Sequence, residues 1–192
     1  MYKFFFLIIP LSLGTSCQAP PFSPDSPLTP VPVQSKLILH QPLRIAPNTV
    51  SLWFQDGAQM PANNLNRYYP HCKFETWQMQ DSEKTVEPDT FVIHKVVRWD
   101  DYAMQPIQMA SSRVSAGIGV HLNGSDPSPI NTAMEMFLHS ERQPAVYRLI
   151  CSQWEDATEA NHVTINQIRH ALGGTFSLQL PKQHKSKQPA AQ

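Results

Sequence analysis

The chain has 192 residues, equal numbers of acidic and basic side chains, 18 prolines and only 7 glycines. So few glycines argue against a glycine-rich phosphate loop. The basic cluster Lys182, Lys185 and Lys187 lies in a polar C-terminal stretch, 181–192, that we expect to be a disordered tail. Because a polyphosphate backbone is bound by a concentrated cationic surface, this composition also argues against nucleic acid as a partner.

The first residues have the layout of an export signal. One cation, Lys3, precedes the apolar run 4–13, and three small residues follow at 14–16. The run is shorter than the about 20 apolar residues that a membrane-spanning helix needs, and Pro10 would kink a longer helix. We therefore expect residues 1–16 to be a signal peptide that is removed.

Cys17 follows this signal directly and is the expected first residue of the mature chain. The run Leu13-Gly14-Thr15-Ser16-Cys17 resembles the lipobox of bacterial lipoproteins, although that family usually has leucine where this chain has Gly14. The resemblance implies that Cys17 receives a diacylglyceryl thioether and then an acyl chain. Two or three acyl chains hold a protein stably at a membrane surface.

The residue after Cys17 bears on the destination of the protein. By the enterobacterial sorting rule of this family, a lipoprotein without aspartate at that position goes to the outer membrane, and this chain has Gln18. The resemblance therefore implies an outer-membrane anchor facing the periplasm. The alternative is a periplasmic or secreted protein in which Cys17 is incidental.

A proline-rich segment, 17–35, separates the signal from the rest of the chain. Its prolines are Pro20, Pro21, Pro24, Pro27, Pro30 and Pro32. Such a run favours the extended polyproline II conformation over a helix or a paired strand. We expect a tether that holds the domain off the membrane. Its P-x-x-P spacings also permit the alternative of a ligand for a proline-binding domain.

Residues 36–180 remain for one folded domain, a normal length for a chain with its own core. Apolar and polar residues alternate in short runs between polar turns, which predicts strands. The expected strands are 37–45 with a break at Pro42, 49–55, 72–79, 90–99, 107–122, 132–140, 145–154 and 176–180. The pattern predicts a mainly β fold, either an antiparallel sandwich or a partly closed barrel, with one short C-terminal helix.

That helix is expected within VTINQIRHALGG, residues 163–174. Thr164 and Gln167 have the spacing of a capping box. Glycines at the end of the segment, Gly173 or Gly174, stand where a helix C-cap is expected. The apolar stripe of this helix consists of Ile165, Ile168 and Leu172.

Two cysteines, Cys72 and Cys151, lie inside the domain. In an oxidising envelope compartment, such a pair favours a disulfide, and no C-x-x-C spacing competes for them. The strands that carry the two residues should then be neighbours. The alternative is a pair of buried free thiols.

The run NRYYPHCKFE, 66–75, is the most distinctive local sequence. Tyr68, Tyr69 and His71 could form an exposed binding surface, because tyrosine pairs a large apolar face with a hydrogen-bonding tip. In the alternative interpretation, the tyrosines pack over the disulfide. This run and the later VTINQIRHALGG also resemble a group of small uncharacterised exported proteins of proteobacteria, a resemblance that implies no activity.

Catalytic and metal-binding motifs are missing from the sequence. It has no G-x-S-x-G and no H-E-x-x-H, and its eight histidines do not form short-range ligand pairs. We therefore expect no metal, no cofactor and no enzymatic activity, but a lipid-anchored domain that binds or supports another envelope component. The alternatives are a secreted ligand-binding module and a hydrolase that combines a distant histidine, His94 or His139, with Asp100 or Asp101.

Overall fold

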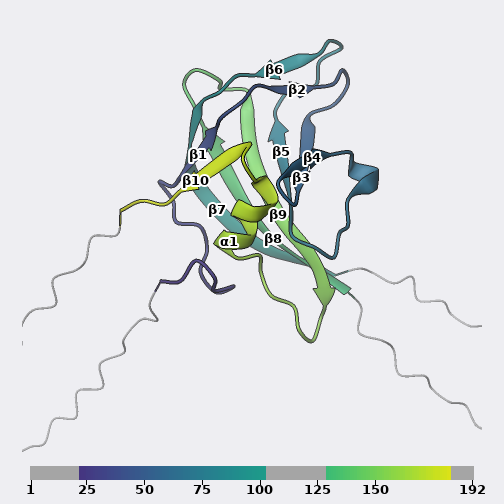
Figure 1. The fold of residues 1–192 in the computed structure, drawn as a ribbon, viewed down its shortest axis with the longest axis vertical. Helices are drawn as coiled ribbons and strands as arrows, with labels where there is room; N and C mark the ends of the chain where they lie inside the picture. The colour runs from purple at the N-terminus through teal and green to yellow at the C-terminus, as the bar shows by residue number, and fades with distance from the viewer. Residues whose placement is uncertain (1–21, 103–128, 183–192) are drawn as a thin grey trace, which may run out of the picture.

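A computed structural model describes residues 22–102 and 129–182 of the protein (Figure 1). The described part is mainly β, as the sequence predicts. Its strands are β1 (Lys36–Leu39), β2 (Leu43–Ile45), β3 (Ser51–Gln55), β4 (Ala58–Met60), β5 (His71–Thr76), β6 (Lys84–Val86), β7 (Thr90–Tyr102), β8 (Pro129–His139), β9 (Val146–Asp156) and β10 (Phe176–Gln179). The helical elements are a 3₁₀ turn, Ala62–Asn64, and helix α1, Ile165–Leu172.

Eight strands form one sheet, in which every pair of neighbours is antiparallel, in the order β10-β1-β7-β8-β9-β5-β3-β4. The sheet curls into a half-barrel. The curl brings β3, which lies next to one end of the sheet, close to β10 at the other end. The ring of Phe54 on β3 meets the ring of Phe176 on β10 edge to face, with their centroids 5.4 Å apart. A second sheet pairs β2 with β6.

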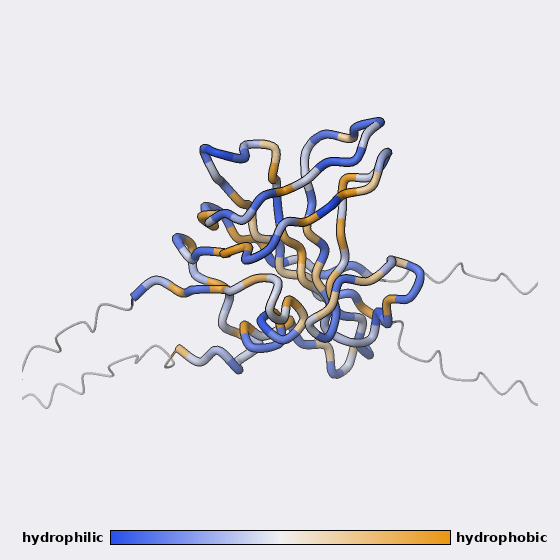
Figure 2. Tube along the Cα trace, turned by 45° about the horizontal axis from the view of Figure 1, so that its top comes forward, coloured by the Kyte–Doolittle hydropathy of each residue, from blue (hydrophilic) through white to orange (hydrophobic). Residues whose placement is uncertain are grey.

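The core fills the concave side of the half-barrel. Side chains alternate between the two faces of a strand, so Leu52 and Phe54 of β3 point inward together with Phe74 of β5, and all three are buried. Figure 2 shows apolar segments gathered in the middle of the trace, with hydrophilic loops around them. The convex side of the sheet is the outer face.

Helix α1 closes the open side of the half-barrel and contacts β3, β5 and β10. The Thr164 side chain accepts a hydrogen bond from the Gln167 backbone N–H, and the Gln167 side chain accepts one from the Thr164 N–H, so the predicted capping box is present. Gly173 is the C-cap. The buried stripe is Ile165, Ile168, Ala171 and Leu172.

A disulfide joins Cys72 of β5 to Cys151 of β9, as predicted. The two residues lie directly opposite each other in the antiparallel pair, with Cα atoms 4.1 Å apart. Both are buried on the concave side. The bond links segments 79 residues apart in sequence, in the centre of the sheet.

Residues 22–35, the described part of the expected tether, pack against the domain. Val31 is 2% exposed within the core, and the Gln34 N–H donates to the Ile93 carbonyl of β7. Further along, the Asn166 amide of α1 donates to Asp25, and Arg98 donates to the Pro27 carbonyl. The folded domain therefore begins before Lys36, and this stretch is not a spacer. Prolines exclude helix and ladder pairing, but they do not prevent an extended chain from docking through its side chains.

Two short strands, β4 and β6, were not among the strands that the sequence predicts. Each has three residues, too few to show a period. The predicted break at Pro42 separates β1 from β2, because proline cannot donate to a ladder. The strand expected over 107–122 lies outside the described residues.

Candidate functional site

The outer face of the sheet carries an ordered set of polar and aromatic side chains. The pairing register places His71 of β5 beside Ser152 of β9, Ser152 beside Ala133 of β8, and Ala133 beside Trp99 of β7. Two small side chains therefore lie between a histidine and a tryptophan. This produces a depression on a face that would otherwise be convex.

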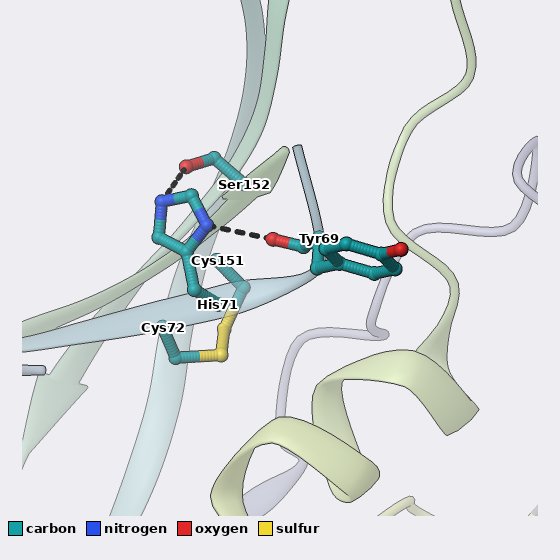
Figure 3. The surroundings of a disulfide bond; sticks show 5 residues. All are labelled: Tyr69, His71, Cys72, Cys151 and Ser152. Atoms are coloured by element: carbon teal, nitrogen blue, oxygen red, sulfur yellow. Dashed lines mark hydrogen bonds between the residues drawn. A yellow bond between two sulfur atoms is a disulfide. The ribbon is translucent and has the colours of Figure 1, made fainter. Parts of the chain in front are cut away.

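His71 is held from two sides (Figure 3). One ring nitrogen, Nδ1, lies 2.9 Å from the Tyr69 carbonyl oxygen, and the other, Nε2, lies 3.2 Å from Ser152 Oγ. The disulfide lies on the opposite face of the two strands, because Cys72 and Cys151 are the next residues along each strand. The disulfide thus fixes the strand pair that positions His71 against Ser152.

The environment of His71 also fixes its protonation. Burial lowers the pKa of His71 below its ordinary value of 6.5, and the nearby charge of Arg67 lowers it further, while the bond to the Tyr69 carbonyl opposes both. The neutral ring has one N–H. Since a carbonyl only accepts, Nδ1 carries the proton, and Nε2 accepts from the Ser152 hydroxyl.

Three tryptophans surround the depression and make it a cavity of about 230 Å³. Trp53 extends from β3, Trp99 from β7 and Trp154 from β9. Between them lie the side chains of Ser152 and Asn131. We call this the tryptophan cavity.

The loop between β4 and β5 supplies one wall. The Gln55 side chain bonds both the carbonyl and the N–H of Asn66, at 2.8 and 3.0 Å, and so pins the loop to β3. The backbone N–H of Trp154 on β9 donates to the Arg67 carbonyl at 2.8 Å. These contacts bring the Arg67 and Leu65 side chains to the rim of the tryptophan cavity.

A charged cluster occupies the outer face next to the cavity. Arg148 of β9 binds Glu75 of β5 and Glu135 of β8, and Lys73 binds Glu75 at 2.6 Å. Burial alone would raise the pKa of Glu75, but hydrogen bonds from Lys73 and Arg148 hold it below its ordinary value. Lys73 also lies over the Trp53 ring, 5.2 Å from its centroid. The cluster therefore anchors one wall of the cavity.

A second depression lies on the far side of this cluster, with a volume of about 380 Å³. Trp77 stacks on Tyr147 at a centroid distance of 3.5 Å, and Phe137 meets Tyr147 edge to face. His94 and His139 also line it. Its aromatic side chains stack mainly on one another.

The sequence-predicted site residues separate in the structure. The side chains of Tyr68 and Tyr69 are exposed, whereas His71 is buried and lines the tryptophan cavity. The Tyr69 ring points away from His71 (Figure 3). A binding role for Tyr68 and Tyr69 stays a prediction, and Cys17 lies outside the described residues.

The histidine–aspartate groupings considered for a hydrolase are not formed. Asp100 lies 3.5 Å from His162 rather than near His94 or His139, and Asp101 pairs in register with Asn131. Instead, the structure brings His71 to Ser152, a partner that sequence reasoning did not find. The signal was weak, because the residues are 81 positions apart and only the strand register joins them.

In the ranges 22–102 and 129–182, no three His, Cys, Asp or Glu side chains gather closely enough to hold a metal ion. Within the same ranges, the structure has no helix of the length and apolar character that a membrane crossing needs.

No family model matches the chain, and neither a curated protein nor a solved structure does.

Proposed function

We propose that the protein is a lipid-anchored component of the bacterial cell envelope, whose β domain binds another envelope component through the tryptophan cavity. The observation that carries the binding role is the cavity itself. Ligand sites are concave and mostly apolar, with a few convergent polar groups, and three indole rings around Asn131 and Ser152 have this character.

The location is supported by two sequence features and one structural feature. The export signal 1–16 and the lipobox-like run ending at Cys17 indicate export and acylation. The Cys72–Cys151 disulfide is consistent with an oxidising compartment. Acylation at Cys17 would then hold the domain at the outer membrane, facing the periplasm.

Sedimentation tests the binding role. The full mature chain with Cys17→Ser, which cannot be acylated, is mixed with isolated envelope fragments and centrifuged. We expect saturable co-sedimentation that Trp99→Ala reduces about tenfold or more, because the loss of a buried aromatic anchor commonly costs at least about 2 kcal/mol. A thermal melt of each variant confirms that it is folded.

Two exposed aromatic residues serve as matched controls. Tyr102 lies three residues beyond Trp99 on β7, does not line the cavity and is 64% exposed, so Tyr102→Ala should bind normally. Tyr68→Ala should also bind normally. If Tyr68→Ala abolishes sedimentation and Trp99→Ala does not, the tyrosine surface is the binding site and the cavity is not.

A hydrolase is the second candidate, favoured by the contact of Ser152 with His71. A neutral histidine that accepts from a serine hydroxyl is the arrangement that activates a nucleophile. However, Ser152 lies in the interior of β9, between β5 and β8, where backbone N–H groups bond to neighbouring strands and do not form an oxyanion hole. Binding is therefore the better supported role.

Ester hydrolysis separates the two candidates. With a panel of activated esters, we expect the same background rate for the natural chain and for Ser152→Ala. Turnover that Ser152→Ala abolishes, while the thermal melt is unchanged, would establish the hydrolase instead.

A further inference from the structure

We infer that the tryptophan cavity binds an acidic sugar, a single ring that carries a carboxylate and hydroxyl groups. This inference rests on the proposed function, because it names the ligand of the same cavity. Three features support it: the size of the cavity, an unpaired cation at its rim and an unused hydrogen-bond acceptor, Ser152 Oγ.

Size limits the ligand to about one ring. Sites for drug-sized molecules measure roughly 300–1,000 Å³, and this cavity measures about 230 Å³. Indole rings surround it at Trp53, Trp99 and Trp154. The C–H groups on one face of a sugar ring form a flat apolar surface that can lie on such an indole face.

Charge at the rim favours an anion. The cavity is lined by two cations, Arg67 and Lys73, and by no aspartate or glutamate among the described residues. Lys73 is already paired with Glu75 at 2.6 Å. Arg67, in contrast, has no carboxylate within 4.0 Å in the described part of the chain. An arginine fork binds a carboxylate through two parallel hydrogen bonds, so Arg67 is the expected anion contact.

One polar group that lines the cavity, the Ser152 hydroxyl, is free to accept a hydrogen bond. The Ser152 hydroxyl donates a hydrogen bond to His71 Nε2, which leaves the lone pairs of Ser152 Oγ to accept. A ligand hydroxyl satisfies this acceptor.

The combination distinguishes an acidic sugar from simpler ligands. A neutral sugar would leave Arg67 without a partner. An aromatic carboxylate could use Arg67 and the indole faces, but it would bring no donor to Ser152. A ring with both hydroxyls and a carboxylate uses all three groups.

Direct titration tests this assignment. The full mature chain with Cys17→Ser is labelled with ¹⁵N, and the indole N–H signals are followed as the methyl glycoside of glucuronic acid, methyl glucoside or benzoate is added. We expect the glucuronide to bind about tenfold or more tightly than methyl glucoside, the size of one charged hydrogen-bonded contact, and more tightly than benzoate.

Arg67→Gln should remove the preference for the acid and leave the weaker binding of methyl glucoside unchanged. The control is Arg44→Gln, a similarly exposed arginine on β2 that does not line the cavity, and it should keep the full preference. A preference that survives Arg67→Gln overturns the inference. So does benzoate binding as tightly as the glucuronide.

Failure here is distinguishable from failure of the proposed function. If the glucuronide does not bind while envelope sedimentation still depends on Trp99, the ligand class is wrong and the binding role stands. If the glucuronide does not bind and envelope sedimentation does not depend on Trp99 either, both the ligand class and the binding role are wrong.

Discussion

The backbones of Gly173 and Gly57 lie so close together that there is no room for a side chain at Gly173. A Cβ built there would lie closer than 3.0 Å to the Cα, carbonyl carbon and carbonyl oxygen of Gly57. The Gly57 N–H also donates to the Ala171 carbonyl of α1. The β3–β4 turn is thus docked on the end of the helix, which closes the half-barrel.

Gly173→Ala should destabilise the fold. The clash involves backbone rather than a flexible side chain, and Gly173 has φ of 54°, where alanine is strained by about 1 kcal/mol or more. We expect a loss of about 2 kcal/mol or more in the free energy of unfolding, measured with urea. Gly174→Ala is the matched control, because a Cβ there meets nothing within 4 Å; an equal loss in both variants would contradict the docking.

Removal of the disulfide should lower stability without changing the fold. The double variant Cys72→Ala, Cys151→Ala frees a loop of 79 residues, for which loop entropy predicts at most about 4 kcal/mol, with less usually realised. The free energy of unfolding in urea provides the measurement, compared with the oxidised natural chain. Equal stability of the two proteins would show that the bond does not constrain the unfolded chain.

Arg148 should matter for stability more than an exposed arginine does. Arg148→Ala leaves two carboxylates, Glu75 and Glu135, without their shared partner in a half-buried cluster. The expected loss is about 1–3 kcal/mol. Arg44→Ala, which breaks a pair with both side chains largely exposed, should cost no more than about 1 kcal/mol. Equal losses in urea unfolding would argue against the cluster.

Stability should decrease between neutral and mildly acidic pH. The lowered pKa of His71 means that the unfolded chain takes up a proton more readily than the folded chain does. Stability from this group is therefore fully present above about 6.5, the ordinary value, and is lost as the pH falls toward the lower folded-state pKa. His162 shifts in the same direction through burial and the charge of Arg98.

Urea unfolding at several pH values measures this slope. In His71→Gln the slope between pH 7.5 and 5.5 should be smaller, since one titrating group is gone and glutamine does not titrate. An unchanged slope would mean that His71 does not contribute to it.

Local sequence patterns predicted the local structure well. The alternation of Leu52 and Phe54 predicted β3, and the spacing of Thr164 and Gln167 predicted the start of α1, because each of these signals lies within a few residues. The two domain cysteines predicted their disulfide, because each had only the other as a partner inside the domain. The packing of 22–35 was not predicted, since its prolines indicate an extended chain but not where Val31 docks.

The tryptophan cavity could not be predicted from local signals. Its walls come from β3, β7, β9 and the loop that carries Arg67, and only the register of the strands brings them together. A shift of one residue in β8 would turn Asn131 to the other face. Of the three residues expected to form a binding surface, only His71 lines this cavity.

The central claim is that this domain is held at a membrane surface, and mass spectrometry of the mature protein tests it most directly. We predict an N-terminal peptide that begins at Cys17 and carries the mass of a diacylglyceryl group with an additional acyl chain. An unmodified Cys17 thiol, or a mature chain that begins at a later residue, would contradict the account.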